Sequence, residues 1–125
     1  YTSLTIFAHY YLAIKKQFVV KRTCFNPVPK VDSVVLKIIP RKQPLLDIDN
    51  ENLFFSMVRS AFWGRRKPLL SALKKSPYIK IIKEISSCPF FEKNKLIRGE
   101  KMSIDMFFEL YEQIKNKVEE SEILK

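Results

Sequence analysis

Two short segments rich in β-branched residues limit the fold of this 125-residue chain more than any other feature. The segments "QFVVKR" (17–22) and "VDSVVLKIIP" (31–40) predict two strands, and Pro40 ends the second. The second segment is apolar over nearly its whole length, which predicts a strand that is covered on both faces. Two strands do not make a stable sheet by themselves. This region is therefore either the last part of a larger α/β sheet or a pair of strands that needs another partner.

A stiff loop, "CFNPVPKVDS" (24–33), joins the two predicted strands. Pro27 and Pro29 fix their own φ angles and restrict the residues before them to extended backbone. Such a loop loses little entropy on folding, so it holds the ring of Phe25 in one place. The pattern leaves two interpretations open. The ring belongs to the core, or it lies at the edge of a site and stacks on a base drawn out of its helix.

The rest of the chain has helical periodicity. The polar, proline-marked segment "RKQPLLDID" (41–49) is the most favourable domain boundary, because the pattern changes after it. Ser103 has the right position to cap the last helix, and the tail "EESEILK" is expected to fray. The spacing of apolar residues predicts helices at 3–15, 50–63, 68–76, 79–86 and from 103 to about 118.

The net charge of +10 is distributed unevenly along the chain. Residues 1–42 carry 8 Lys/Arg and 1 acidic residue, and residues 43–98 carry 11 and 5. Residues 99–125 carry 4 and 7, so the C-terminal segment is mildly acidic. This asymmetry favours a nucleic-acid surface. An anionic membrane, an acidic protein partner, or no polyanionic partner at all remain alternatives.

The strongest basic cluster lies in "WGRRKPLLSALKKS" (63–76), where one predicted helix ends and the next begins. Arginine side chains that fan out from such a corner bind phosphate oxygens through paired hydrogen bonds, and the backbone N–H groups of the second helix add positive charge. An ordinary solvated corner is the alternative. Trp63 and Tyr78 are candidates to stack on bases, whereas Phe62 is expected in the core. The candidate RNA-binding residues are Arg59, Arg65, Arg66, Lys67, Lys74 and Lys75.

The sequence contains no catalytic constellation and no metal-ligand spacing. His9 lacks a nucleophile partner and is interpreted as structural, and hydrogen bonds from side chain to backbone account for Asp32 and Ser33. Cys24 and Cys88 are interpreted as free thiols in a reducing cytosol. No signal peptide or apolar run of membrane-spanning length is present, and no glycine-rich loop exists to hold a cofactor. We expect a soluble, cytoplasmic protein without a metal.

Four stretches, in order, resemble the ribosomal RNA adenine dimethyltransferases (KsgA type), relatives of the erythromycin-resistance methylases. "FNPVPKVDSVV" is similar to the F-x-P-x-P-K-V-D-S segment of that family, and "SAFWGRRKPLLSAL" to its A-F-x-x-R-R-K-x-L segment. "YTSLTIFAHYY" resembles the helix after the catalytic Asn-x-x-Tyr motif, and "RGEKMSIDMFFEL" the R-x-E-x-L-S segment. The match covers nearly the whole chain. Thr2, His9 and Gly64 depart mildly from the family pattern.

The resemblance implies a two-domain enzyme. Its Rossmann-like domain binds S-adenosylmethionine and dimethylates two adjacent adenosines of small-subunit ribosomal RNA, a step of rRNA processing and ribosome biogenesis. The implied fold is a mixed α/β remnant, namely the last helix and two strands of the Rossmann-like methyltransferase domain, followed by a small all-α domain. Residues 1–42 would be that remnant and residues 43–125 the helical RNA-binding domain. The implied partner is small-subunit ribosomal RNA or the small ribosomal subunit. We expect the protein to be a monomer that does not bind a membrane.

The resemblance also assigns roles residue by residue. Phe25 would pack against the flipped adenine, with Pro27 and Pro29 holding that wall rigid. Arg65, Arg66 and Lys67 would face the RNA. The implied loop-support residues are Lys30, Val31, Asp32 and Ser33.

The family's glycine-rich cofactor loop, acidic ribose-binding residue and Asn-x-x-Tyr motif have no counterpart here and would lie before Tyr1. We therefore expect a piece of a longer protein, with no catalytic residue and no S-adenosylmethionine site in these 125 residues, and no methylation by the chain alone. A stand-alone RNA-binding module without catalysis is the alternative. A helical unit that mainly binds other proteins is a third possibility.

Overall fold

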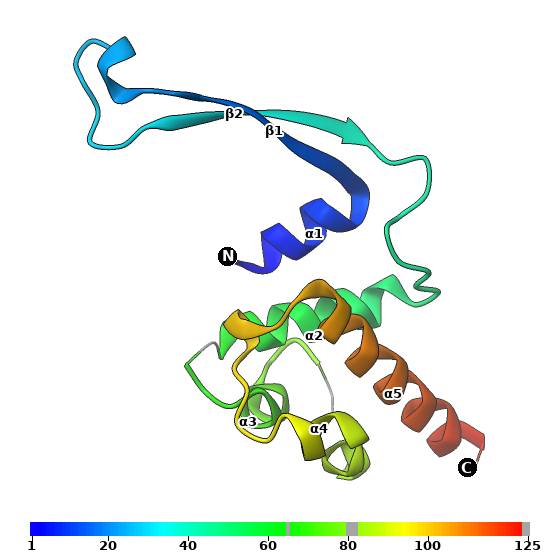
Figure 1. The fold of residues 1–125 in the computed structure, drawn as a ribbon. Coiled ribbons are helices and arrows are strands. Elements are labelled where there is room, and N and C mark those ends of the chain that lie inside the picture. The colour runs from blue at the N-terminus through cyan, green and yellow to red at the C-terminus, as the bar shows by residue number, and fades with distance from the viewer. Residues whose placement is uncertain (65, 80–82, 124–125) are drawn as a thin grey trace. The chain divides into compact units, whose positions relative to one another are not determined.

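The computed structural model describes residues 1–64, 66–79 and 83–123, and the chain forms helices with a two-stranded sheet (Figure 1). It divides into two compact units, one made of residues 8–45 and the other of residues 1–7 with 46–125. The predicted boundary between residues 42 and 43 stays a prediction. The elements are α1 (Ser3–Tyr11), β1 (Leu12–Val20), η1 (Arg22–Cys24), β2 (Ser33–Pro40), α2 (Glu51–Trp63), α3 (Leu69–Lys75), η2 (Lys83–Ser87), α4 (Pro89–Lys93), η3 (Gly99–Lys101) and α5 (Ile104–Ile123).

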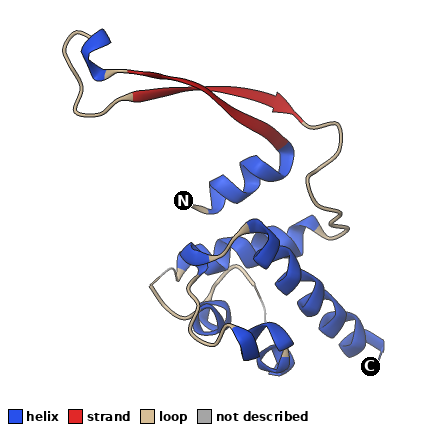
Figure 2. Cartoon of the chain, viewed as in Figure 1, coloured by secondary structure: helices blue, strands red, loops and turns tan. Residues whose placement is uncertain are grey.

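The two predicted strands form one antiparallel hairpin, drawn in red in Figure 2. Leu12 lies opposite Pro40, Val20 lies opposite Ser33, and the register shifts between Lys16 and Phe18. The prediction of a helix over 3–15 and a strand from residue 17 was wrong at this boundary, because α1 ends at Tyr11 and β1 begins at the next residue. Pairing with β2 satisfies the backbone groups of residues 12–16, and this outweighs their helical periodicity.

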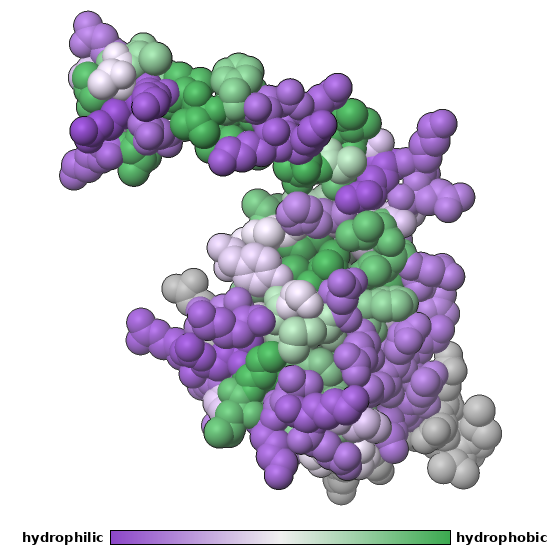
Figure 3. Space-filling model, in the orientation of Figure 1, coloured by the Kyte–Doolittle hydropathy of each residue, from purple (hydrophilic) through white to green (hydrophobic). Residues whose placement is uncertain are grey.

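Both faces of the hairpin carry apolar side chains that are open to solvent among the described residues. Every residue of β2 is exposed, and so are Phe18 and Val19 on β1. Figure 3 shows hydrophobic side chains along this hairpin, interspersed with hydrophilic ones. The prediction that β2 is covered on both faces was therefore wrong for the described part of this chain. Its continuous apolar sequence still indicates a strand that needs a partner.

The helices of residues 46–125 enclose a hydrophobic core. α2 packs against α3, α5 and η3, and α4 packs against α5. Phe54 and Tyr111 are both buried and meet edge to face, with their ring centroids 5.7 Å apart. The apolar stripe predicted for α2 is confirmed at its centre. Among the side chains that the structure describes, the buried residues of α2, α3 and α5 are Phe54, Met57, Val58, Ser60, Ala61, Leu69, Ala72, Leu73, Phe107, Leu110, Tyr111 and Ile114.

Side-chain caps begin the two long helices. The Oδ1 atom of Asn50 accepts a hydrogen bond from the Leu53 N–H at 3.1 Å, and the Oγ atom of Ser103 accepts one from the Met106 N–H at 3.2 Å. The predicted Ser103 cap is thus confirmed. α5 continues to Ile123, beyond the predicted end near Val118.

The segment between α3 and α5 differs from the prediction. Pro68 is the N-cap of α3 rather than its first helical residue. Of the helix predicted over 79–86, residues 80–82 lie outside the described residues, and Lys83–Ser87 forms a 3-10 helix. α4, which begins at Pro89, was not predicted. No helix in the described part of the chain is long and apolar enough to cross a membrane.

Candidate nucleic-acid interface

Cationic and aromatic side chains alternate along the solvent-exposed side of α2 and beyond its end. Arg59 and Trp63 are one helical turn apart on α2, so their side chains are neighbours. The guanidinium carbon of Arg59 lies 4.2 Å from the centroid of the Tyr78 ring, and Lys67 Nζ lies 5.1 Å from the ring of Trp63. We call these four residues the cation–aromatic row. Both contacts are within the range of attractive cation–π interactions.

Buried serines fix the position of Tyr78. The Ser76 hydroxyl donates to Ser60 Oγ at 2.7 Å, and the Ser60 hydroxyl donates to the Ser56 carbonyl oxygen at 2.7 Å. Ser76 Oγ in turn accepts the Tyr78 N–H at 3.0 Å. The relay joins the chain after α3 to the body of α2, so the Tyr78 ring is held beside Arg59.

Close packing shapes the corner between α2 and α3. A Cβ atom on Gly64 would lie 2.6 Å from Ala72 Cβ, so only glycine fits there. Pro68 pairs with Arg98 in an isolated β-bridge, and the Leu69 N–H donates to the Ile97 carbonyl oxygen at 2.7 Å. The sequence suggested that N–H groups at the start of α3 would help to bind phosphate, but that of Leu69 is already used.

The structure exposes the basic side chains of this corner. Arg66 and Lys67 follow Gly64, and Lys74 and Lys75 end α3. Within the described residues, none of these four cations forms an ion pair with a carboxylate. Arg65, which the sequence analysis named together with Arg66, lies outside the described residues. Phe62, expected in the core, is half-buried, and its ring centroid lies 6.0 Å from that of the buried Phe107.

The proline loop belongs to the other compact unit. Asp32 Oδ1 accepts the backbone N–H of Arg22 at 2.7 Å, which confirms the predicted hydrogen bond from this side chain to the backbone. Ser33, the first residue of β2, closes the loop opposite Val20. Phe25 is 43% exposed, so it is not a core residue in the described part of the chain. Pro27, Pro29 and Lys30 are exposed as well.

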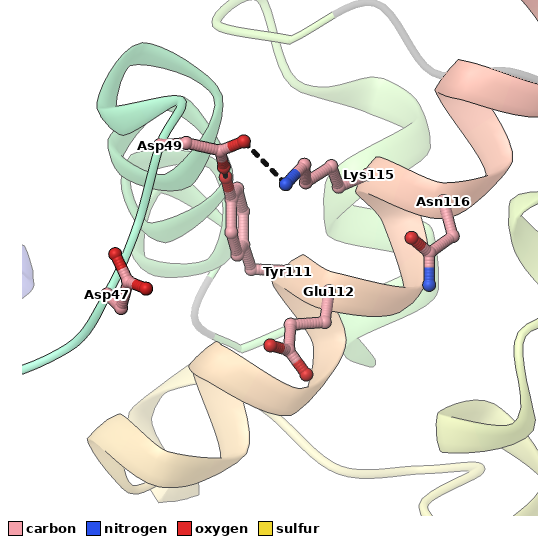
Figure 4. Close-up of a pocket in the computed structure, with 6 residues that line it drawn as sticks. All are labelled: Asp47, Asp49, Tyr111, Glu112, Lys115 and Asn116. Carbon is pink, nitrogen blue, oxygen red and sulfur yellow. Dashed lines mark hydrogen bonds and ion pairs between the residues drawn. The ribbon is translucent and has the colours of Figure 1, made fainter.

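The sequence reasoning missed a polar pocket of about 200 Å³ at the start of α2. Figure 4 shows the Tyr111 hydroxyl and the Lys115 ammonium group converging on Asp49. Tyr111 donates to Asp49 Oδ1 at 2.7 Å and accepts the Asn50 N–H at 3.1 Å, while Lys115 Nζ lies 2.5 Å from Asp49 Oδ2. The Lys115 and Tyr111 hydrogen bonds lower the pKa of Asp49 to about 2.

This pocket is unsuited to a polyanion. Asp47 and Glu112 line it together with Asp49, and Lys115 is the one cation among its lining residues. Its bonds fasten the chain before α2 to α5, across 61 to 62 residues of sequence. No local pattern could have indicated a contact over that distance.

No group of three or more His, Cys, Asp or Glu side chains among the described residues could hold a metal ion. Cys24 is exposed and Cys88 is buried, both with free thiols, as the sequence predicted. Burial raises the pKa of the Cys88 thiol, which disfavours the reactive thiolate.

Residues 1–116 match the family model "Ribosomal RNA adenine dimethylase". The chain is 40% identical over 119 residues to the ribosomal RNA small subunit methyltransferase A of Streptococcus pyogenes serotype M4 (strain MGAS10750). This alignment covers 92% of the chain and 40% of that relative. The relative from serotype M5 (strain Manfredo) gives the same identity, with 92% and 41% coverage. The chain thus spans about 40% of the length of these curated relatives.

Two solved structures share the fold. The 23S rRNA methyltransferase ErmE superposes with a TM-score of 0.63 at 23% identity, over 92% of this chain and 46% of that protein. A dimethyladenosine transferase from Plasmodium falciparum superposes with a TM-score of 0.58 at 23% identity, over 88% and 48%. At this identity the likeness concerns the fold alone.

Proposed function

The chain belongs to the ribosomal RNA adenine dimethylase family, and on this premise we propose that it works as part of an S-adenosylmethionine-dependent rRNA methyltransferase. The complete enzyme dimethylates two adjacent adenosines of small-subunit ribosomal RNA, in the cytoplasm and as a step of ribosome biogenesis. Residues 43–125 bind the RNA. Residues 1–42 contribute the last helix and two strands of the Rossmann-like domain and one wall of the adenine site.

The exposed basic corner after α2 carries the proposal. Phosphate contacts require cations that are accessible and not neutralised by neighbouring carboxylates. Arg66, Lys67, Lys74 and Lys75 meet both conditions among the described residues. The acidic pocket at Asp49 does not meet them, because its one cation, Lys115, is paired with Asp49. The distribution of charge thus favours the end of α2, rather than its start, for RNA.

The loop at Phe25 supports the proposed adenine wall. The ring is partly exposed, and the bond between Asp32 and Arg22 together with Pro27 and Pro29 restrains its loop. Flipping a base out of its helix costs a few kcal/mol, so a stacking ring that is already ordered avoids a further entropic cost. Lys30 and Ser33 complete the loop as supporting residues.

The described residues do not fit S-adenosylmethionine. The chain has two glycines, and both are used for close packing, Gly64 against Ala72 and Gly99 against Ala61. Neither opens a loop that could approach a cofactor. We expect no binding of S-adenosylmethionine to the 125-residue chain by isothermal titration calorimetry. Binding with micromolar affinity would contradict this expectation.

Salt dependence of RNA binding tests the proposed interface. The 125-residue chain is titrated with a small-subunit rRNA segment at several salt concentrations, and the logarithm of the affinity is plotted against the logarithm of the salt concentration. Replacing Arg65 and Arg66 together with glutamine should weaken binding and flatten the slope by up to about two, roughly one unit per lost phosphate contact.

A matched variant controls for the loss of charge. Lys93 and Lys95 are exposed, lie at the end of α4 and just after it, and are not among the proposed RNA-binding residues. Replacing both with glutamine removes the same two charges, and the slope should stay nearly unchanged. Equal slopes for the two double variants would show that Arg65 and Arg66 belong to the solvated surface.

A non-catalytic RNA-binding module is the second candidate, because residues 46–125 possess a hydrophobic core of their own. The reading frame that encodes the chain distinguishes the two. A glycine-rich loop and an Asn-x-x-Tyr motif upstream of Tyr1 support the enzyme, whereas a start codon near Tyr1 supports the module. RNA binding that is absent or insensitive to salt would favour a protein-binding role over both.

A further inference from the structure

The cation–aromatic row has properties that phosphate binding alone does not explain. Trp63 and Tyr78 are 45% and 41% exposed, although large aromatic rings gain most from burial. Each ring has a cation against it, Lys67 for Trp63 and Arg59 for Tyr78. Cations suffice to hold phosphates, so exposed aromatic surface next to them indicates a ligand that also has flat, apolar faces.

We propose that the cation–aromatic row binds unpaired RNA nucleotides, with bases stacked on the exposed ring surfaces of Trp63 and Tyr78. Arg59 and Lys67 then meet the adjacent phosphates. The inference rests on the proposed function and adds to it the form of RNA that this surface selects. Bases in a duplex are stacked on one another and offer no free face, so the row distinguishes loops and single-stranded segments from helices.

The spacing of the row suits successive nucleotides. Arg59 and Trp63 stand one turn apart on α2, with Cβ atoms about 5–6 Å from each other. The Tyr78 ring contacts Arg59 and Lys67 contacts Trp63, so each ring has a cation next to it. A strand of unpaired RNA likewise alternates flat bases with charged phosphates.

The row is also ordered before any ligand arrives. The bonds from Tyr78 N to Ser76 and from Ser76 to the buried Ser60 hold the Tyr78 backbone, and Pro77 fixes its own φ angle between them. Trp63 is the last residue of α2, and the tight contact between Gly64 and Ala72 holds the backbone that follows it. A surface fixed in this way loses little conformational entropy when a base stacks on it.

The fluorescence of Trp63 gives a direct test, because it is the one tryptophan of the 125-residue chain. The chain is titrated with a single-stranded oligoribonucleotide and, separately, with the same sequence annealed to its complement. We expect quenching of the emission by the single strand and a much weaker response to the duplex. No difference between the two RNAs would overturn the inference.

Two pairs of variants separate stacking from charge. Trp63→Leu and Tyr78→Leu should each weaken single-strand binding by about fivefold or more, because a base loses its aromatic partner. Trp63→Phe and Tyr78→Phe keep a ring and should restore most of the affinity. The salt slope should remain unchanged in all four, since no phosphate contact is removed. Thermal unfolding of each variant checks that the helical unit is intact.

The outcomes distinguish this inference from the proposed function. Leucine variants with unchanged affinity, in a chain that still binds RNA with a steep salt slope, would refute stacking and leave the phosphate interface standing. Leucine and phenylalanine variants weakened to the same extent would also refute it, because the ring would then not matter. Failure of the unsubstituted chain to bind any RNA would remove both.

Discussion

Replacing Gly99 with alanine should destabilise the helical unit strongly. Gly99 begins η3, which packs against α2, and its backbone does not have a positive φ angle. Conformational strain is therefore not the reason for glycine. The reason is space, because a Cβ atom would lie 2.6 Å from the Ala61 carbonyl oxygen and 2.8 Å from both the Ala61 carbonyl carbon and Cβ.

The size of the effect follows from what can move. Ordinary contacts of a Cβ atom are 3.4–4 Å, so the gap between η3 and α2 would have to widen by at least about 0.8 Å. Two of the three contacted atoms are backbone atoms of Ala61 in the last turn of α2, which cannot rotate away as a side chain could. Overpacking of this kind costs about 1–3 kcal/mol, and a unit of this size loses roughly 4–8 °C of melting temperature per kcal/mol.

Thermal unfolding followed by circular dichroism measures this change, with urea denaturation as the second readout. Gly64→Ala provides the informative comparison, because the nearest atom there is the Cβ of Ala72, at 2.6 Å, followed by Ala72 Cα at 3.1 Å. Ala72→Gly should therefore rescue part of the Gly64→Ala defect in a double-mutant cycle, with a coupling of about 1 kcal/mol.

Ala61→Gly should rescue Gly99→Ala much less, since it leaves the carbonyl contact in place. A Gly99→Ala variant with an unchanged melting temperature would refute the reasoning. Complete rescue by Ala61→Gly would do the same. The Gly99→Ala substitution should also disturb the basic corner between α2 and α3. Arg98, the residue before Gly99, pairs with Pro68 at that corner.

Two further predictions concern the polar pocket. The folded-state pKa of Asp49 lies at about 2, below its ordinary 3.8, so the carboxylate stabilises the fold above pH 3.8 and loses this effect as the pH falls towards 2. Asp49→Asn should reduce the loss of unfolding free energy between pH 3.8 and about 2. An unchanged pH dependence would contradict the bonds of Asp49 to Lys115 and Tyr111. Tyr111→Phe leaves the Asn50 N–H without its partner and should cost about 1–3 kcal/mol in urea denaturation, whereas Phe108→Leu, as a control on the same helix, removes no hydrogen bond.

Short-range patterns predicted much of the helical unit. Ser103 predicted the start of α5. The apolar stripe of α2 predicted its buried face, with four members buried and Leu53 and Phe62 half-buried; the four are Phe54, Met57, Val58 and Ala61. Both signals are local, because a helix places residues three and four positions apart on one face and a cap needs a side chain within reach of the first turn. The existence of two strands and a proline loop between them could be predicted in the same way.

The boundary between α1 and β1 needed the tertiary structure. Residues 12–15 fit both the helical stripe and a strand, and only pairing with residues 37–40, far along the chain, selects the strand. The candidate RNA-binding cations could be named from sequence. Their arrangement could not, since the contact of Arg59 with Tyr78 depends on hydrogen bonds among Ser56, Ser60 and Ser76.

The sequence by itself determined the family, the excess of positive charge and the main helices, because each depends on residue types or on neighbours within a turn or two. Only the tertiary structure decided that Asp49 binds Tyr111 and Lys115, that Gly64 and Gly99 each press against an alanine, and that two cation–aromatic pairs share one side of α2. Most of these contacts join residues far apart in the sequence, such as Asp49 with Tyr111 and Gly99 with Ala61, and only packing of the core brings such residues together.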